Sequence, residues 1–263
     1  VSFAGFDVQA PWEDAPALIT FLERIGIPGT HPWVAGIQSC DKVTTWYPFG
    51  QIPRESHDAC IQALEAVDAH FEANGEQIRR RTSDPDFERA RLAQVALEAF
   101  QHSVYTIPHD YNAGFSVRDV GMAHVFQSLR ELRFLNAKTV IWAANVHVAR
   151  NRLPRGEVPM GSHLARALGS DYVTFALTAY ATETADPPRH CGLVKRARGS
   201  VEDRLHKLKE DFLLVDLKRS SSLKRNATYW MGLDRVKARK DFDGLFYLDY
   251  AAVMESTLWE PCR

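Results

Sequence analysis

The sequence predicts an α/β fold: a three-layer α/β/α core with a mixed, mostly parallel sheet and a long antiparallel helical insertion. Residues 61–135 contain three stretches in which apolar side chains recur every three or four positions, the period of a helix that buries one face. After residue 137, short apolar runs alternate with helical stretches, which is typical of a sheet with helices on its faces. We therefore predict an α/β core formed by residues 1–53 and 137–263, and a helical insertion formed by residues 54–136.

The first 53 residues begin with an apolar run, Val1–Asp7, which predicts a short buried strand that ends in an acidic residue. Strand-end acids in α/β proteins often face the ligand crevice, although a loop or capping role fits Asp7 equally well. Apolar spacing then predicts a helix over Trp12–Ile25, which Gly26 ends. Residues 27–53 are rich in Pro, Gly, Thr and Trp and indicate a long irregular connection.

The helical insertion is predicted as three amphipathic helices with short connections, which favours antiparallel packing. The first contains Ile61 and Phe71 and closes near Gly75; the second starts at Ser83-Asp84-Pro85. Pro108 separates the second helix from a third, whose apolar positions continue to Leu135.

The C-terminal half is predicted to supply most of the sheet. Thr139–Ala144 is β-branched and apolar without alternation, which suits a strand covered on both faces. The other predicted strands are Tyr172–Thr178, Phe212–Asp216 and Gly244–Asp249, and the predicted helices are Met160–Leu168, ended by Gly169, and Val201–Leu208, with Ser200 as N-cap.

Composition excludes several classes of function. The 32 Lys and Arg residues balance 33 Asp and Glu residues, so the net charge of -1 disfavours nucleic-acid wrapping or docking on an acidic membrane. The runs Arg79–Arg81 and Lys195–Arg198 lack interleaved aromatic residues, so we interpret them as solvated charge. No apolar run is long enough for a membrane span.

Cysteine usage gives no metal or redox motif. The four cysteines form no CxxC pair, which disfavours a zinc ribbon or a thioredoxin-type site. Cys60 lies on the apolar stripe of a predicted helix and is interpreted as a small buried thiol. The motifs GxSxG, GxxxxGK[ST], GxGxxG and HExxH are absent, so no metal or cofactor is predicted.

Two polar clusters remain as candidates for chemistry. Asn145, His147, Arg150 and Asn151 follow the predicted strand Thr139–Ala144, at the sheet edge where α/β proteins bind ligands. Asn145 and His147 would point to one side if the strand continued, and a histidine there could take a proton from water. The alternative is a histidine that hydrogen-bonds a neighbouring loop.

The second cluster is Arg118-Asp119, which the sequence places near the start of the third helix of the insertion. An arginine whose guanidinium is fixed by a carboxylate could bind a substrate carboxylate or carbonyl. A helix-start salt bridge on the surface fits the same two residues.

These clusters and several further segments resemble, in order along the chain, the motifs of the erythromycin esterase family. Gly5–Gln9 resembles its GxDxQ strand, Arg118–Ala123 its RDxxMA helix, Val140–His147 its vvWAHNxH strand, Met160–Val173 its MGxxL…lGxxY segment, Gly199–Leu205 its GSxE..L helix, Leu214–Leu217 its strand ending in Asp, and Phe242–Gly244 its fDaliyi element. The resemblance spans nearly all 263 residues.

The resemblance implies a metal-independent hydrolase without a cofactor, in which a histidine activates water against the carbonyl of a small-molecule ester or lactone. By match, His147 and Arg118 are the catalytic residues. Asn145 and Asp119 are their neighbours, and Asp7 and Glu202 match positions expected near the cleft. The oligomeric state and the compartment stay open.

Two departures separate this sequence from the family pattern. Ala144 stands where the family has the first histidine of HNxH, and alanine cannot donate, accept or carry a proton. The GExxHG motif, expected to carry the general base, has no match in the chain. We therefore expect the α/β core to be incomplete at its N-terminus, the chain to be the C-terminal part of a longer hydrolase, and these 263 residues alone to lack esterase activity.

A catalytically inactive binding or scaffold relative that keeps the fold and cleft is the alternative. An accessory role in polysaccharide biosynthesis is a third reading, for which no residue gives specific support.

Overall fold

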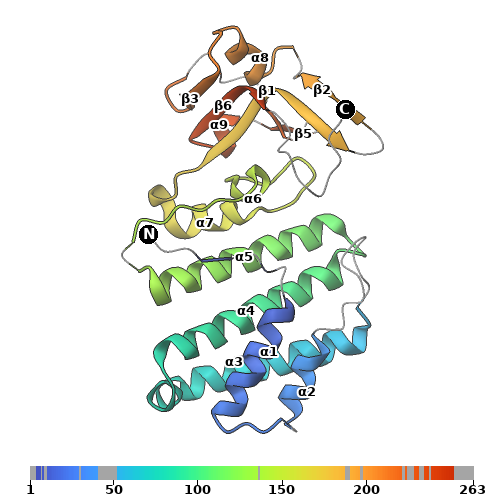
Figure 1. Cartoon of the computed structure of the whole chain (residues 1–263), viewed down its shortest axis with the longest axis vertical. Helices are drawn as coiled ribbons and strands as arrows, with labels where there is room; N and C mark the ends of the chain where they lie inside the picture. The colour runs from blue at the N-terminus through green and yellow to red at the C-terminus, as the bar shows by residue number, and fades with distance from the viewer. Residues whose placement is uncertain are drawn as a thin grey trace. The chain divides into compact units, whose positions relative to one another are not determined.

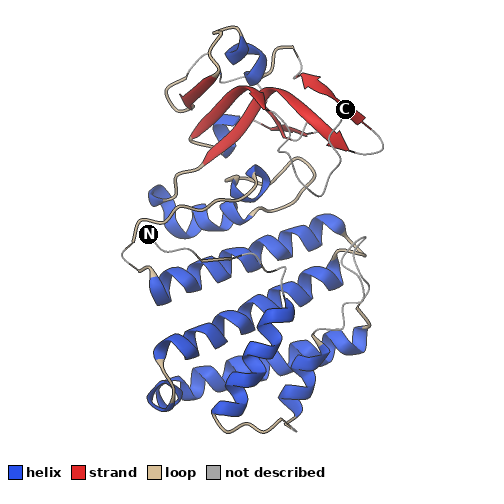
Figure 2. Ribbon diagram, in the orientation of Figure 1, coloured by secondary structure: helices blue, strands red, loops and turns tan. Residues whose placement is uncertain are grey.

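The computed structural model divides into two compact units, residues 1–141 and 142–263, here called the helical unit and the sheet unit (Figure 1). Together they form a mixed α/β structure that is mostly helical (Figure 2). The residues described are 4–6, 8, 11–29, 31–40, 52–135, 137–186, 190–195, 198–220, 223, 228–230, 234–236 and 238–251.

The helical unit contains α1 (Pro11–Arg24), α2 (Pro32–Ser39), α3 (Arg54–Arg81), α4 (Asp84–Thr106) and α5 (Tyr111–Arg133). Short connections join α3, α4 and α5, and α4 packs against both α3 and α5. Side-chain oxygens begin two of these helices: Ser83 accepts from the amide of Asp86 at α4, and Asp110 accepts from the amide of Ala113 at α5. Helices therefore occur over each of the three stretches in which the sequence predicts them.

The core of the helical unit comes from the apolar stripes that the sequence shows. The predicted positions Leu18, Leu22, Leu64, Phe71 and Leu97 are all fully buried. Helical amphipathicity therefore identified both the helices and the faces that they pack together.

The first helix of the insertion does not close near Gly75, because α3 continues through it to Arg81. A Cβ at Gly75 would lie 3.4 Å from the ring of Phe87, so α3 passes close to α4 here. Glycine costs a helix interior about 1 kcal/mol, and tertiary packing outweighs that preference.

The predicted irregular connection over residues 27–53 is wrong in part, because it contains α2. His31 caps this helix by accepting, through Nδ1, from the amide of Trp33 at 3.3 Å. Cys40, at the end of α2, forms a disulfide with Cys60 of α3. Cys60 is buried as expected, but it is not a free thiol, because the fold brings together two cysteines 20 residues apart.

The sheet unit contains α6 (Asn145–Val148), α7 (Met160–Leu168), α8 (Val201–His206) and α9 (Ala238–Asp241) with β1 (Phe175–Asp186), β2 (His190–Lys195), β3 (Phe212–Asp216) and β6 (Gly244–Ala251). The four strands form one sheet in the order β2-β1-β6-β3, and β4 (Thr228–Trp230) pairs separately with β5 (Asp234–Val236). β1 and β6 are parallel, whereas β2 and β3 pair antiparallel with their neighbours. The described sheet is thus mixed, but not mostly parallel.

The predicted strand Thr139–Ala144 has no strand partner among the described residues and is irregular. Val140 and Trp142 are 90% and 87% exposed, so the prediction of a strand covered on both faces is wrong for this structure. A run of β-branched residues becomes a strand only where another strand supplies its hydrogen bonds. Ala4–Phe6 is also irregular, and the rest of the predicted strand Val1–Asp7, Val1–Phe3 and Asp7, lies outside the described residues.

The two faces of the sheet differ. α8 packs on β1 and β6, and places Val201 and Leu205 over one face of the sheet, where Leu245 and Tyr247 are fully buried. The opposite face carries large apolar side chains that are exposed, here called the open face: Phe175, Leu177, Phe212, Leu214, Phe246 and Tyr250. The expected third layer is therefore not seen over this face in the described part of the chain.

Candidate functional site

Asn145 begins α6, and its side chain binds the backbone of β1. Its Nδ2 donates to the carbonyl oxygen of Leu177 at 2.6 Å, and its Oδ1 accepts from the amide of Leu177 at 2.9 Å. This pair of hydrogen bonds has the pattern that a neighbouring strand would supply. Asn145 thus anchors the turn of α6 to the sheet.

His147 lies in the same turn and is 8% exposed. Because the chain is helical here, residues two apart lie roughly 200° apart around the axis, so Asn145 and His147 do not share one side. The prediction that they point the same way depended on a continuing strand and is wrong. α7 packs on this turn through Gly161, where a Cβ would lie 2.5 Å from the backbone of Val148 and Ala149.

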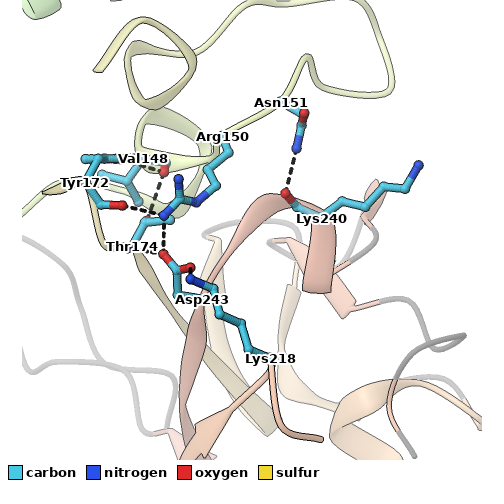
Figure 3. Close-up of polar contacts among 8 residues, drawn as sticks. All are labelled: Val148, Arg150, Asn151, Tyr172, Thr174, Lys218, Lys240 and Asp243. Atoms are coloured by element: carbon cyan, nitrogen blue, oxygen red, sulfur yellow. Dashed lines mark hydrogen bonds and ion pairs between the residues drawn. The ribbon is translucent and has the colours of Figure 1, made fainter. Parts of the chain in front are cut away.

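Arg150, from the same sequence cluster, belongs to a structural polar network rather than to an open site (Figure 3). Its guanidinium donates to a carboxylate oxygen of Asp243 and to the carbonyl oxygen of Tyr172. Asp243 also accepts from the amide of Thr174 at 2.9 Å and pairs with the ammonium of Lys218 at 2.6 Å. The network ties the segment after α6 to the start of β1 and β6.

The charge of Asp243 is stabilised by these contacts. Burial alone would raise the pKa of its carboxyl, but hydrogen bonds from Arg150, Lys218 and the Thr174 amide outweigh burial and hold the pKa below its ordinary value. Asn151 adds a further tie, since its Nδ2 donates to the carbonyl oxygen of Lys240 at 2.6 Å. Arg150 and Asn151 therefore fix the loop that follows His147.

Glu202 is fully buried in α8 and accepts from the hydroxyl of Thr178 at 2.7 Å. Its helix begins as predicted, with Ser200 accepting from the amide of Asp203 at 3.0 Å. The structure places Glu202 between α8 and β1, on the covered face of the sheet.

Arg118 and Asp119 lie in the helical unit, about two turns inside α5 rather than at its start. Asp119 is fully buried and Arg118 is half-buried, with its Nε buried. A helix-start salt bridge on the surface does not describe such a pair. Gly121, in the same motif, allows α5 to approach α4, because a Cβ there would lie 2.2 Å from that of Ala99.

The candidate residues thus occur as Asn145 and His147 on one turn of the sheet unit, and Arg118 and Asp119 on one helix of the helical unit. Asp7 lies outside the described residues. Arg118, Asp119, His147 and Glu202 each make at least one contact in the structure.

His206 forms a histidine–carboxylate pair that the sequence analysis did not identify. Its Nδ1 lies 2.6 Å from Oδ1 of Asp249, and its ring stacks on Tyr180 at 3.9 Å. The buried Tyr247 donates to the same carboxylate oxygen at 2.6 Å. Forty-three residues separate His206 from Asp249, so no local motif indicated the pair.

Within the described ranges, no group of three or more His, Cys, Asp or Glu side chains is arranged to hold a metal ion. Of the helices described, none combines the length and apolar character that a bilayer crossing requires.

Comparisons with known proteins give the family. The family model "Erythromycin esterase" matches residues 1–251. A structure of a Bacillus cereus protein matches with a TM-score of 0.78 and 18% identity, over 96% of this chain and 67% of that one. A mutant of the erythromycin esterase EreC in its open conformation matches with a TM-score of 0.69 and 15% identity, over 92% of this chain and 66% of that one.

A succinoglycan biosynthesis protein gives a TM-score of 0.66 and 18% identity, over 96% of this chain and 65% of that one. No curated protein matches the sequence. The chain spans about two thirds of the length of these solved structures, and at such identities they show a shared fold. With a family model that matches residues 1–251, the chain belongs to the erythromycin esterase family.

Proposed function

We propose that this chain is part of a hydrolase that cleaves a small-molecule ester or lactone with water activated by a histidine, without a metal or cofactor. The observation that carries the proposal is the family match over residues 1–251, within which His147 and Arg118 occupy the motif positions expected to be catalytic. The esterase named among the structural relatives is consistent with this class of reaction.

His147 is proposed to handle the proton of the reaction. A neutral imidazole can accept a proton from water and return it to the leaving alcohol. Its position supports this role, because Asn145 anchors the turn to β1 and Gly161 lets α7 pack closely against it. A fixed turn keeps the imidazole oriented.

Arg118 is proposed to bind the substrate carbonyl or the oxyanion that forms from it. A guanidinium presents fixed N–H donors to developing negative charge. Asp119, the next residue along α5, is fully buried. Asn145, Asp7 and Glu202 are proposed as supporting residues around the cleft.

We further propose that a segment not among these 263 residues supplies the complete enzyme with its base and with a third layer over the open face of the sheet. Three observations support this. Ala144 replaces a family histidine, the open face exposes six large apolar side chains, and the chain spans about two thirds of its structural relatives. Sheets in α/β folds bury both faces, and exposed apolar patches of this kind mark contact surfaces.

A non-catalytic binding relative is the second candidate, favoured by one observation. Ala144 is the N-cap of α6 and makes no side-chain hydrogen bond there, so the position of the family histidine supplies no polar group. In such a protein His147 would be kept for packing.

The test is ester hydrolysis by the protein from its complete coding sequence, assayed on aryl esters and macrolides. Replacing His147 with Ala should lower turnover by about 10²-fold or more, the scale for losing an acid–base group. His109→Ala, at an exposed histidine, is the matched control and should retain activity. Unchanged turnover in His147→Ala would exclude the proposed role, and a complete protein without turnover would favour the binding relative.

The same assay tests the missing segment. The 263-residue chain should show no turnover that depends on His147. Turnover by that chain, lost in His147→Ala, would contradict the missing base while leaving the esterase proposal standing.

A further inference from the structure

Among the described strands, β3 pairs with β6 alone and so forms one edge of the four-stranded sheet (Figure 1). Its five residues, Phe212–Asp216, include no Lys or Pro, and its register with β6 contains no bulge. Proteins commonly use these features to protect a sheet edge from pairing with another strand. The side chains of Phe212 and Leu214 are 54% and 60% exposed. This edge is therefore apolar and unprotected.

Two hydrogen bonds show which backbone groups of β3 bind β6. The amide of Leu217 donates to the carbonyl oxygen of Asp243, and the amide of Asp249 donates to that of Asp211, both at 2.9 Å. Hydrogen-bonded pairs alternate along an antiparallel ladder, so every second residue from 211 to 217 bonds β6. The residues between them turn their backbone groups away from β6.

Phe212 and Leu214 therefore direct their amides and carbonyl oxygens outwards from the sheet edge. No hydrogen bond to these four groups is seen in the described part of the chain. Asp216 also faces outwards, but its carbonyl oxygen accepts from the amide of Ser220 at 3.1 Å. The edge thus offers two free donors and two free acceptors to a further strand.

Another strand can reach these groups, because a groove of about 620 Å³ lies beside β3. Its lining includes Leu213 and Val215 of β3, Leu205 of α8, and the apolar side chains Leu208 and Leu223. Leu208 is 58% exposed, so part of this apolar surface is uncovered. The groove therefore combines space beside the β3 backbone with apolar side chains that an added strand would contact.

Charge does not oppose a second copy of the chain in this groove. The lining contains the cations Arg204 and Lys207 and the anion Asp216. The ammonium of Lys207 lies 3.0 Å from the carboxylate of Asp203. Two cations therefore lie with two carboxylates, and hydrogen bonds and apolar contacts decide which strand fits.

We propose that the β3 strands of two copies of this chain pair antiparallel, related by a two-fold axis that passes through Leu213. In this register Phe212 lies opposite Leu214 of the second copy, and the two residues exchange both of their hydrogen bonds. The two-fold axis repeats this pair. All the free donors and acceptors of Phe212 and Leu214 in both copies are then satisfied.

The side chains match in the same register. On the open face, Phe212 contacts Leu214 of the second copy, and on the other face the two copies of Leu213 meet. Moving the axis to Leu214 would instead place Phe212 opposite Asp216, whose carbonyl oxygen is already engaged. Free groups meet free groups and apolar side chains meet apolar side chains, which is the self-complementarity that a two-fold interface requires.

Sedimentation equilibrium of the 263-residue chain measures the association. An interface of one short strand and its flanking side chains is small, so the dissociation constant of the dimer should be on the order of 100 µM. The chain should be monomeric at about 10 µM and mostly dimeric at about 1 mM. A monomer at every concentration would overturn the proposal.

Amide hydrogen exchange locates the pairing in the unchanged protein. Exchange at Phe212 and Leu214 should slow by about threefold or more between those two concentrations, because the dimer protects their amides. The amides of Leu213 and Val215, which bond β6, should be protected at both concentrations. A dimer in which exchange at Phe212 and Leu214 does not change would contradict the proposed edge.

The variant Leu214→Pro removes an N–H that faces the second copy, and it leaves the hydrogen bonds to β6 intact. It should raise the dissociation constant of the dimer at least about tenfold. Leu214→Ala, which keeps the N–H, is the matched variant and should weaken the dimer less. An equal effect of the two variants would argue against the backbone hydrogen bonds.

Leu177→Lys is the control on the open face, since it places a charge there but lies on β1, away from the edge. It should leave the association unchanged. If it abolished the dimer while Leu214→Pro retained it, the copies would associate through the open face and the edge assignment would be wrong. The exchange experiment decides the question even if the proline variant folds poorly. The pairing extends the sheet at its edge, so it depends neither on the proposed esterase function nor on a layer over the open face.

Discussion

The helical unit and the sheet unit bury their apolar side chains to different extents. Phe71 and Phe87 are fully enclosed among the helices, whereas Phe175 and Phe212 of the sheet lie exposed on the open face. The apolar stripes of the helices find partners within residues 1–141, and the sheet finds a partner, α8, for one face only. As described, the sheet unit therefore leaves more of its apolar surface uncovered than the helical unit does, and stability measurements can test this directly.

The largest expected difference comes from removing the same ring in each unit. Phe71 is 1% exposed, and replacing it with Ala should lower the free energy of unfolding by about 3–5 kcal/mol, because a cavity remains in the core. Phe212 is 54% exposed, and replacing it with Ala should lower the free energy of unfolding by less than about 1 kcal/mol. Urea unfolding of the two variants of the 263-residue chain measures both.

An equal loss in both variants would mean that the open face is covered in solution by this chain itself. In the protein from the complete coding sequence, the proposed third layer should raise the cost of Phe212→Ala well above its value in the 263-residue chain.

The disulfide between Cys40 and Cys60 gives the helical unit a covalent tie between α2 and α3. Removing it by the double change Cys40→Ala and Cys60→Ala should lower stability by about 3 kcal/mol, as expected for a loop of this length. Thermal unfolding of the oxidised and substituted proteins measures the loss. Cys191 and Cys262 should be replaced by Ser in both samples, and two thiols that titrate after denaturation without reductant, in the sample that keeps Cys40 and Cys60, would disprove the bond.

A smaller effect is expected for the polar network of the sheet unit. Asp243→Asn should cost about 2 kcal/mol near neutral pH, because it removes charge-assisted hydrogen bonds to Arg150 and Lys218. The folded pKa of Asp243 is depressed, so its contribution is present above the ordinary value of 3.8 and is lost as pH falls through the folded pKa.

Urea unfolding between about pH 7 and pH 3 should therefore show a shallower acid loss for Asp243→Asn than for the parent. Asp86→Asn, which removes one partner of the exposed Arg24 ion pair, serves as the comparison in the helical unit. If the stability of Asp243→Asn depended on pH in the same way as that of the parent protein, the polar network would not stabilise the charge of Asp243.

The smallest effect should follow Asn145→Ala, which removes two hydrogen bonds to the exposed edge of β1 at Leu177 and should cost about 1 kcal/mol. Amide hydrogen exchange at Leu177 should speed up in this variant. Unchanged protection would mean that the carboxamide does not hold α6 to the sheet in solution.

Much of the helical unit could be predicted from the sequence, because helical periodicity is local. The stripe containing Leu64 and Phe71 specifies both a helix and its buried face. The prediction failed where a local preference met a tertiary contact, as at Gly75, which packs beside Phe87. The short helix α2 was missed because its eight residues carry little periodic signal.

The candidate site was predictable in part. The order of motifs identified the family and pointed to His147 and Arg118, but not to the pair formed by His206 and Asp249. Such contacts join residues far apart in the sequence, and no spacing rule reports them. The helical turn at Asn145 was mistaken for a strand end because an apolar run looks the same in both settings.

Features that depend on residues near one another in the chain could be predicted from the sequence alone. They are the apolar period of the helices, the capping side chains such as Ser83 and Ser200, and the ordered motifs. Pairing in space needs the folded chain. It set the mixed strand order, joined Cys40 to Cys60, and left Thr139–Ala144 without a strand partner among the described residues. Other segments supply a strand's hydrogen-bond partners and cover its buried face. A sequence can therefore indicate that a strand needs a partner, but not which segment will pair with it.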